Sequence, residues 1–168
     1  MNSILQTERL MLRQFELSDS KFIIELVNSA GWIEFIGERN IKTEEAAIHY
    51  LQNGPMKSYK EKGFGLSMVE RKDGTPVGMC GILKRDSLDN PDIGFAFLPE
   101  FMGMGYAFEM AKATLRYAKD NLNIKTIVAI TVPSNKRSIR LLEKIGLRFS
   151  KTIYPPAERE ELMLFTTG

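Results

Sequence analysis

The chain has 168 residues, the size of one domain with a proper core, and its 23 lysines and arginines nearly balance 21 acids, so no net charge favours nucleic acid or a membrane surface. Cys80 is the single cysteine, which excludes a disulfide framework, and neither a signal peptide nor a membrane-spanning apolar run of roughly 20 residues is visible. We therefore expect one cytoplasmic domain over residues 1–168 that binds neither nucleic acid nor membrane.

The N-terminal part predicts a strand and then a helix. Residues 7–15 partly alternate between apolar and polar, as a strand does, and Ser18 and Asp19 offer a cap for a helix with apolar residues at helical spacing. Residues 31–37 are apolar and aromatic and are bracketed by glycines. We interpret them either as a loop folded into the core or as the wall of a ligand pocket.

Residues 43–53 predict a second helix, which Gly54 and Pro55 end. His49 is the single histidine and lies in this helix with no cysteine near it, so we expect a surface histidine and no metal site. The three lysines between residues 57 and 62 are interpreted as a solvated face.

Two strands, residues 64–71 and 76–85, are predicted around Asp73 and Gly74, which is hairpin turn chemistry. Cys80 lies in the second strand. It is either a nucleophile or a small buried apolar residue, and the lack of a nearby histidine–acid pair favours the buried role.

The centre of the chain reads as strand, glycine-rich turn and helix. An apolar strand over residues 93–98 is followed by a turn with Gly103 and Gly105, and then by a helical pattern to Asn121. Free N–H groups at the positive end of that helix suit phosphate, and the glycines allow close approach. A dinucleotide fingerprint would need a third glycine where Phe108 stands, and a P-loop would need Gly-Lys-Ser/Thr, so both are excluded.

The remaining elements complete an α/β fold. Residues 124–132 are apolar on both faces, as in a covered strand, and the crossover helix before them implies a parallel pair joined in the right-handed sense. A helix over residues 135–145 and two strands, 147–153 and 161–165, follow. We predict a mixed sheet of about seven strands with helices on both faces.

Three segments resemble the GNAT N-acetyltransferases, and in particular their RimJ/RimL-like branch. The turn resembles the acetyl-CoA motif Q/R-x-x-G-x-G/A, with Met102 in the first slot, Gly105 in the first glycine slot and Ala107 in the last. Residues 135–147 resemble the second family signature, N-x-x-S/A-x-x-x-Y/L-x-K-x-G-F/L, and the opening Thr-Glu-Arg-Leu-x-Leu-Arg at residues 7–13 resembles the start of the branch. The resemblance covers essentially the whole chain.

The resemblance implies a GNAT fold in which two parallel strands splay apart around acetyl-CoA, with no metal. Backbone amides of the turn would hold the pyrophosphate, the Asn135 amide would face the pantetheine, and Lys136 and Arg137 are the nearest matched cations for the 3′-phosphate. The cofactor-binding residues that it implies are Phe97, Leu98, Met102, Gly103, Met104, Gly105, Tyr106, Ala107, Asn135, Arg137 and Ser138.

The implied chemistry is direct attack of a primary amine on the thioester. Leu142 stands where the family often has a tyrosine acid, so Ser138 is left as the acid that protonates the thiolate. A backbone N–H at Phe97 or Leu98 would stabilise the oxyanion. Asp92 is the first candidate base, with Asp89 and Glu34 as alternatives. Trp32, Phe35, Phe64 and Asp89 are the candidate acceptor-binding residues, although the acids at 86, 89 and 92 could simply attract a cationic acceptor or be solvated.

The acceptor is inferred from proton energetics. A lysine-type amine has a pKa near 10.4 and an α-amine one near 7.7, so a site poor in strong bases suits the α-amine of a peptide or protein N-terminus better. A polyamine or antibiotic acceptor, or a non-catalytic acyl-CoA sensor, are the alternatives. Monomer and homodimer are both compatible with the sequence.

Overall fold

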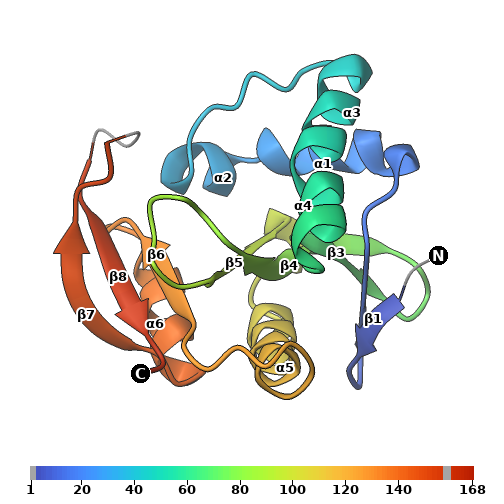
Figure 1. The fold of residues 1–168 in the computed structure, drawn as a ribbon. Helices are drawn as coiled ribbons and strands as arrows, with labels where there is room; N and C mark the ends of the chain where they lie inside the picture. Colours follow the sequence, from blue (N-terminus) through green and yellow to red (C-terminus); the bar gives the residue numbers. More distant parts are fainter. Residues whose placement is uncertain (1–2, 157–159) are drawn as a thin grey trace.

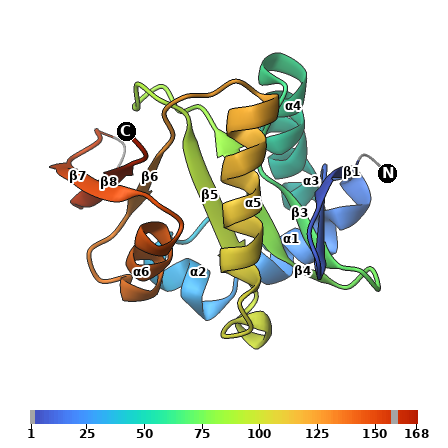
Figure 2. The same ribbon diagram turned by 90° about the horizontal axis from the view of Figure 1, so that it is seen from below.

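The computed structural model describes residues 3–156 and 160–168 and shows one mixed eight-stranded sheet with helices on both faces (Figures 1 and 2). The strands are β1 (Ser3–Gln6), β2 (Leu10–Arg13), β3 (Ser67–Arg71), β4 (Pro76–Leu83), β5 (Asp92–Phe97), β6 (Val128–Thr131), β7 (Arg148–Ile153) and β8 (Leu162–Thr166). Their order in the sheet is β1-β2-β3-β4-β5-β6-β8-β7, and every neighbouring pair is antiparallel except β5 and β6.

The helices form two layers. Those described are α1 (Ser20–Val27), α2 (Ala30–Phe35), α3 (Glu44–Asn53), α4 (Pro55–Lys62), α5 (Tyr106–Asn121) and α6 (Lys136–Lys144), with short 3-10 turns η1 (Leu17–Asp19) and η2 (Pro99–Phe101). Helices α1 to α4 lie on one face of the sheet and α5 and α6 on the other (Figures 1 and 2). None of the described helices is long and apolar enough to cross a membrane.

Strand alternation builds a core on each face. Met68 and Met79 pack under α1 and α3, whereas their neighbours Val69 and Cys80 pack against α5. All four side chains are almost completely buried. The same alternation sends the odd-numbered apolar side chains of β5 towards α5 and the even-numbered ones towards α3.

The two parallel strands diverge almost as soon as they meet. β5 and β6 pair only at Asp92 and Val128, where the Val128 N–H also donates to the Pro91 carbonyl at 2.9 Å. Beyond that point the centre of β5 is half-buried, although the strand lies in the middle of the sheet. The predicted splayed pair is therefore present, and the predicted fold class is confirmed.

Three local predictions were wrong. The strand expected over residues 7–15 is shorter, since β2 covers only Leu10–Arg13. The strand β1 was not predicted; it precedes a turn in which the Thr7 N–H donates to the Leu10 carbonyl at 2.9 Å, and it brings the total to eight strands. Residues 31–37, for which a loop folded into the core was one of two interpretations, contain most of α2 instead. The predicted end of the second helix is confirmed, because α3 stops at Asn53 with Gly54 as its C-cap. Pro55 then begins α4, a helix that was not predicted, because proline suits the first helical position, where its missing N–H costs nothing. The strand expected over 124–132 is shorter, since β6 covers only Val128–Thr131.

Candidate active site

The glycine-rich turn leaves β5 through η2 and enters α5 with an unusual backbone. Gly103 and Gly105 have φ angles of +80° and +82°, which lie in the left-handed region that glycine adopts without strain. Gly105 is the N-cap of α5, so no side chain of its own occupies the first free N–H groups of this 16-residue helix. The turn is exposed from Met102 to Gly105. Exposed amides at the positive end of a long helix form an anion-binding surface.

The second helix that begins beside the gap is α6 (Lys136–Lys144), which follows β6 as α5 follows β5. Because β5 and β6 are parallel, their carboxyl ends lie at the same edge of the sheet, and the two helices begin on either side of the gap between the strands. Asn135 caps α6, since its Oδ1 accepts the Ser138 N–H at 3.2 Å. Its Nδ2 group has no acceptor among residues 3–156 and 160–168, and Ser138 is half-buried in the first turn. Lys136 and Arg137 are exposed beside it.

The predicted oxyanion donor at Leu98 is ruled out by its hydrogen bond. The Leu98 N–H donates to the Val77 carbonyl of β4 at 2.9 Å, so it is already used within the sheet. Opposed residues in an antiparallel pair alternate between hydrogen-bonded and non-hydrogen-bonded positions. Because Leu98 is bonded to β4, the residues at the non-bonded positions before it are Phe97 and Phe95, and their N–H groups point away from β4. Both face the open side towards β6. Phe97 was predicted as one of two alternatives, and Phe95 was missed although the strand period could have indicated it.

Asp92 lies at the apex of the gap, where β5 and β6 still pair. It is 1% exposed, and both its carboxylate oxygens accept from Arg85 Nε, at 3.1 and 3.2 Å. Burial raises the pKa of Asp92 above its ordinary value, and the charge and hydrogen bond of Arg85 only partly offset this. A carboxylate with a raised pKa is a stronger base than an exposed aspartate. The two alternative bases, Glu34 and Asp89, are exposed.

The predicted acceptor-binding residues are not gathered in one place. Trp32 is buried in the cluster that contains Leu98, and its indole N–H is buried without a hydrogen-bond partner among the described residues. Phe35 is half-buried on the same helix, α2. Phe64 instead packs against the cluster beneath α5, on the opposite face of the sheet. Asp89 is exposed in the connection between β4 and β5.

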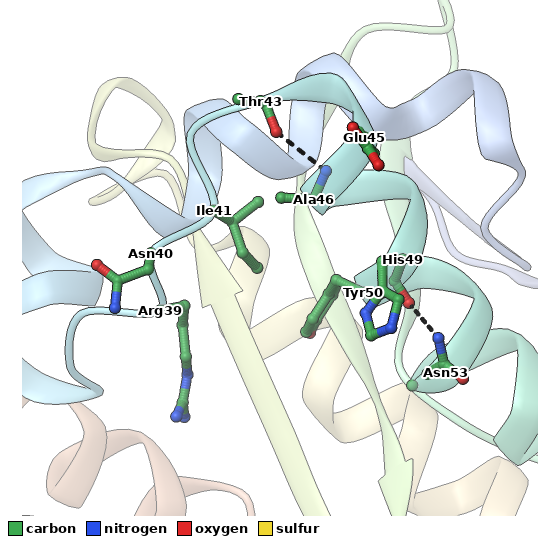
Figure 3. Close-up of a pocket in the computed structure, with 10 residues that line it drawn as sticks. Arg39, Asn40, Ile41, Thr43, Glu45, Ala46, His49, Tyr50 and Asn53 are labelled. Carbon is green, nitrogen blue, oxygen red and sulfur yellow. Dashed lines mark hydrogen bonds between the residues drawn. The ribbon is translucent and has the colours of Figure 1, made fainter.

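A pocket of about 710 Å³ lies between α3 and the segment that precedes it. Figure 3 shows Tyr50, His49 and Asn53 of α3 on one side, with Arg39 and Asn40 on the other. Burial raises the pKa of Tyr50, while the positive charges of Arg39 and Arg85 act against that rise. Ala46 and Tyr50, which line the pocket, pack against the buried cluster beneath α1 and α3, so the pocket lies on that face of the sheet. The sequence did not indicate this pocket, because its lining comes from two segments with no motif.

Cys80 is fully buried in β4, with its Sγ 3.5 Å from Thr114 Oγ1. Burial raises the pKa of its thiol to about 12. The thiol is therefore uncharged at neutral pH and has no route to a substrate, which agrees with the structural role preferred from the sequence.

Comparison with known proteins identifies relatives along most of the chain. The family described as "Acetyltransferase (GNAT) domain" matches residues 9–148. The chain is 38% identical over 99 residues to the uncharacterized protein YkkB of Bacillus subtilis, covering 55% of this chain and 57% of YkkB. It is 29% identical over 142 residues to the uncharacterized N-acetyltransferase YnaD of the same organism, covering 84% of this chain and 81% of YnaD.

Solved structures share the fold. An acetyltransferase from Agrobacterium tumefaciens superposes with a TM-score of 0.82 at 23% identity, covering 99% of this chain and 94% of its own. A chimera of the spermidine N-acetyltransferase SpeG from Vibrio cholerae and hSSAT superposes with a TM-score of 0.76 at 17% identity. A putative ribosomal-protein-serine acetyltransferase from Vibrio cholerae gives a TM-score of 0.77, also at 17% identity. The former match covers 94% of this chain and 93% of the other, and the latter covers 99% and 98%.

Proposed function

Because the chain belongs to the GNAT family of acetyl-CoA-dependent N-acetyltransferases, we propose that it transfers the acetyl group to the α-amine of a peptide or protein N-terminus, as in the RimJ/RimL-like branch. The observation that carries the proposal is the divergence of β5 and β6 after the Asp92–Val128 pair. This divergence leaves a row of N–H groups beside an anion-binding turn.

Acetyl-CoA is placed along β5 in this proposal. Its pyrophosphate lies on the amides between Met102 and Ala107, and its pantetheine arm runs back into the gap towards Asp92. β5 covers about 17 Å from Asp92 to Phe97 at roughly 3.3 Å per residue, and we place the arm along this length. Phe97 N–H meets the arm, Phe95 N–H meets the thioester carbonyl nearer the apex, and the Asn135 amide contacts the arm from α6. Arg137 and Lys136 remain the candidates for the 3′-phosphate.

In this arrangement a residue of the chain is assigned to each step of the reaction. Asp92, through a water molecule, takes the proton that the attacking amine must lose, and the amine nitrogen bonds to the thioester carbon. The oxyanion forms against the Phe95 N–H, a donor fixed in place by the sheet. As the carbon–sulfur bond breaks and the carbonyl re-forms, Ser138 donates a proton to the leaving thiolate and regains one from solvent, while Asp92 returns its proton to solvent.

The charges of the pocket favour an N-terminal peptide over a polyamine. The pocket lining includes one carboxylate, that of Glu45, and one guanidinium, that of Arg39. Arg39 has no acidic ion-pair partner among the described residues. A polycation would find little opposite charge there. The fold does not distinguish a peptide acceptor from a polyamine, because solved structures named for spermidine and for a ribosomal protein both share it. Trp32 and Phe35 are proposed as walls for the first side chains of the peptide, and Asp89 as an exposed contact at the entrance.

The test combines binding and turnover. The purified chain is heated with and without acetyl-CoA, and saturation at 100 times Kd should add about 2.7 kcal/mol of stability. Release of free thiol is then measured with peptides, spermidine and an aminoglycoside as acceptors. The proposal expects both a thermal shift and thiol release with peptides ahead of the other amines. No shift at millimolar acetyl-CoA contradicts the cofactor site, and binding without release for every acceptor favours the sensor alternative.

A further inference from the structure

The opening motif at residues 7–13 has no part in the chemistry above, yet it lies against the glycine-rich turn. Arg9, between β1 and β2, donates from Nε to Glu109 Oε1 at 2.7 Å and from Nη1 to the Met104 carbonyl at 2.8 Å. Its guanidinium also covers the Tyr106 ring, 4.7 Å from the ring centroid. One side chain therefore contacts the last residue before Gly105, the first residue of α5 and the next turn of that helix.

Glu109 fixes Arg9 in this position. Its Oε2 accepts from the Arg9 backbone N–H at 2.9 Å and from the Thr7 hydroxyl, while Oε1 binds the guanidinium. Partial burial by itself raises the pKa of Glu109, but the hydrogen bonds from Thr7 and Arg9 and the charge of Arg9 together lower it below its ordinary value. Glu109 is therefore ionised at neutral pH. Arg9 and Glu109 together carry no net charge. We therefore expect them to affect a bound anion mainly through the orientation that they give to the backbone of the turn.

The consequence follows from the planarity of the peptide bond. In a trans peptide the carbonyl oxygen and the following N–H point in opposite directions. Because Arg9 holds the Met104 carbonyl, the N–H of Gly105 points away from the guanidinium. That N–H has no acceptor in the described part of the chain. Gly105 also suits this place sterically, since a Cβ there would lie 3.2 Å from Arg9 Nη2, with φ at +82°.

We propose that Arg9 is a positioning residue for acetyl-CoA, which holds the Met104–Gly105 peptide so that the Gly105 N–H is presented to the pyrophosphate. The inference rests on the proposed function and assigns a role to the opening motif. Glu109 and Thr7 act through Arg9. Without Arg9, the peptide is free to rotate, and the Glu109 carboxylate is left unpaired near the phosphates.

The test compares two acetyl donors that differ in the pyrophosphate. Acetyl-CoA carries it and S-acetylpantetheine does not, so only acetyl-CoA should sense the orientation of the Gly105 N–H. Arg9→Met should raise KM for acetyl-CoA roughly tenfold or more, the scale of losing a charge-assisted hydrogen bond, with little change in kcat at saturation. The kcat/KM for S-acetylpantetheine should stay at the wild-type value.

Two further variants separate charge from geometry. Arg9→Lys keeps the positive charge but cannot bind Glu109 and Met104 with one rigid fork, so it should show most of the KM increase. Glu109→Gln keeps the shape of the side chain and should produce a smaller increase in the same direction. Arg116→Met, on the exposed side of the same helix, is the matched control and should leave KM for both donors unchanged. Thermal unfolding of each variant confirms that it is folded.

Three outcomes overturn the inference. Unchanged KM for acetyl-CoA in Arg9→Met shows that the turn keeps its geometry without Arg9. An equal loss with both donors shows a general structural role, and a fully active Arg9→Lys shows that charge alone matters. Failure of the wild-type protein to bind acetyl-CoA is a separate result, which removes the proposed function together with this inference.

Discussion

Asp92 of β5 and Val128 of β6 form the single backbone pair between these strands in the described part of the chain. A buried carboxylate therefore lies at the point where the sheet opens, and the N–H groups of Phe95 and Phe97 line the opening beyond it. The proposed base and two donors therefore lie along β5, and the proposed anion-binding turn follows that strand. The proposed reaction depends on that order.

Replacing Asp92 tests the base. Asp92→Asn keeps the size of the side chain but cannot take a proton, so kcat should fall roughly 100-fold or more. Because burial raises the pKa of Asp92, the carboxylate is protonated, and inactive, as the pH falls through that raised value. The acid limb of kcat/KM should therefore lie above the pKa of about 3.9 of an exposed aspartate.

Steady-state rates between acid and neutral pH check this prediction. Asp92→Asn should lose both the acid limb of the kcat/KM profile and most of kcat. Asp120 is an exposed acid at the end of α5, and Asp120→Asn should keep the limb and kcat. A limb that persists in Asp92→Asn assigns the titration to another group.

Ser138 is tested by removing its hydroxyl. Ser138→Ala should lower kcat on the order of 100-fold, with KM for acetyl-CoA little changed, because the hydroxyl acts only as the thiolate leaves. Pre-steady-state mixing ensures that chemistry, and not product release, limits the measured rate. Ser150→Ala, exposed on β7, serves as the control. A Ser138→Ala enzyme with the wild-type kcat leaves protonation of the thiolate to water.

Asn135 has two separable roles. Its Oδ1 caps α6, and losing the cap in Asn135→Ala should cost about 1 kcal/mol of unfolding free energy. Asn135→Asp keeps an oxygen for the Ser138 N–H but has no amide donor, so stability should be retained while KM for acetyl-CoA rises. Urea unfolding and initial rates on the same samples measure the two effects. If the Asp variant matches wild type in both, the amide has only a capping role.

Arg13 is predicted to be a stability determinant. Its guanidinium makes two hydrogen bonds of 2.9 Å to Asp19 and one of 3.2 Å to Glu70, and all three side chains are buried. Arg13→Met leaves two buried carboxylates without their cation and should cost about 3–5 kcal/mol. Urea denaturation measures the loss, with Arg148→Met, exposed on β7, expected to lie within about 0.5 kcal/mol of wild type. A loss below about 1 kcal/mol would show that water or a local shift replaces the cation.

Local sequence signals predicted the turn and helix that we propose bind the cofactor. Glycines at 103 and 105 and the period of the following helix depend only on nearby residues, and the structure shows the turn and α5 where they were expected. What failed depends on distant residues. Whether Leu98 or Phe97 offers its N–H depends on the register between β5 and β4, which no local pattern in β5 records. The contact of Arg9 with Glu109 joins residues 100 positions apart, and the pocket between Arg39 and Tyr50 exists only because α3 packs beside the preceding segment.

The most direct test of the account is an amide NMR titration of the labelled protein with acetyl-CoA. The account predicts large shifts, and slower hydrogen exchange, at the amides of Phe95, Phe97 and Gly105. The amide of Leu98, already bonded to Val77, should keep its exchange rate. Unchanged resonances for Phe95 and Phe97, with the shifts confined to α3 around His49 and Asn53, would contradict it.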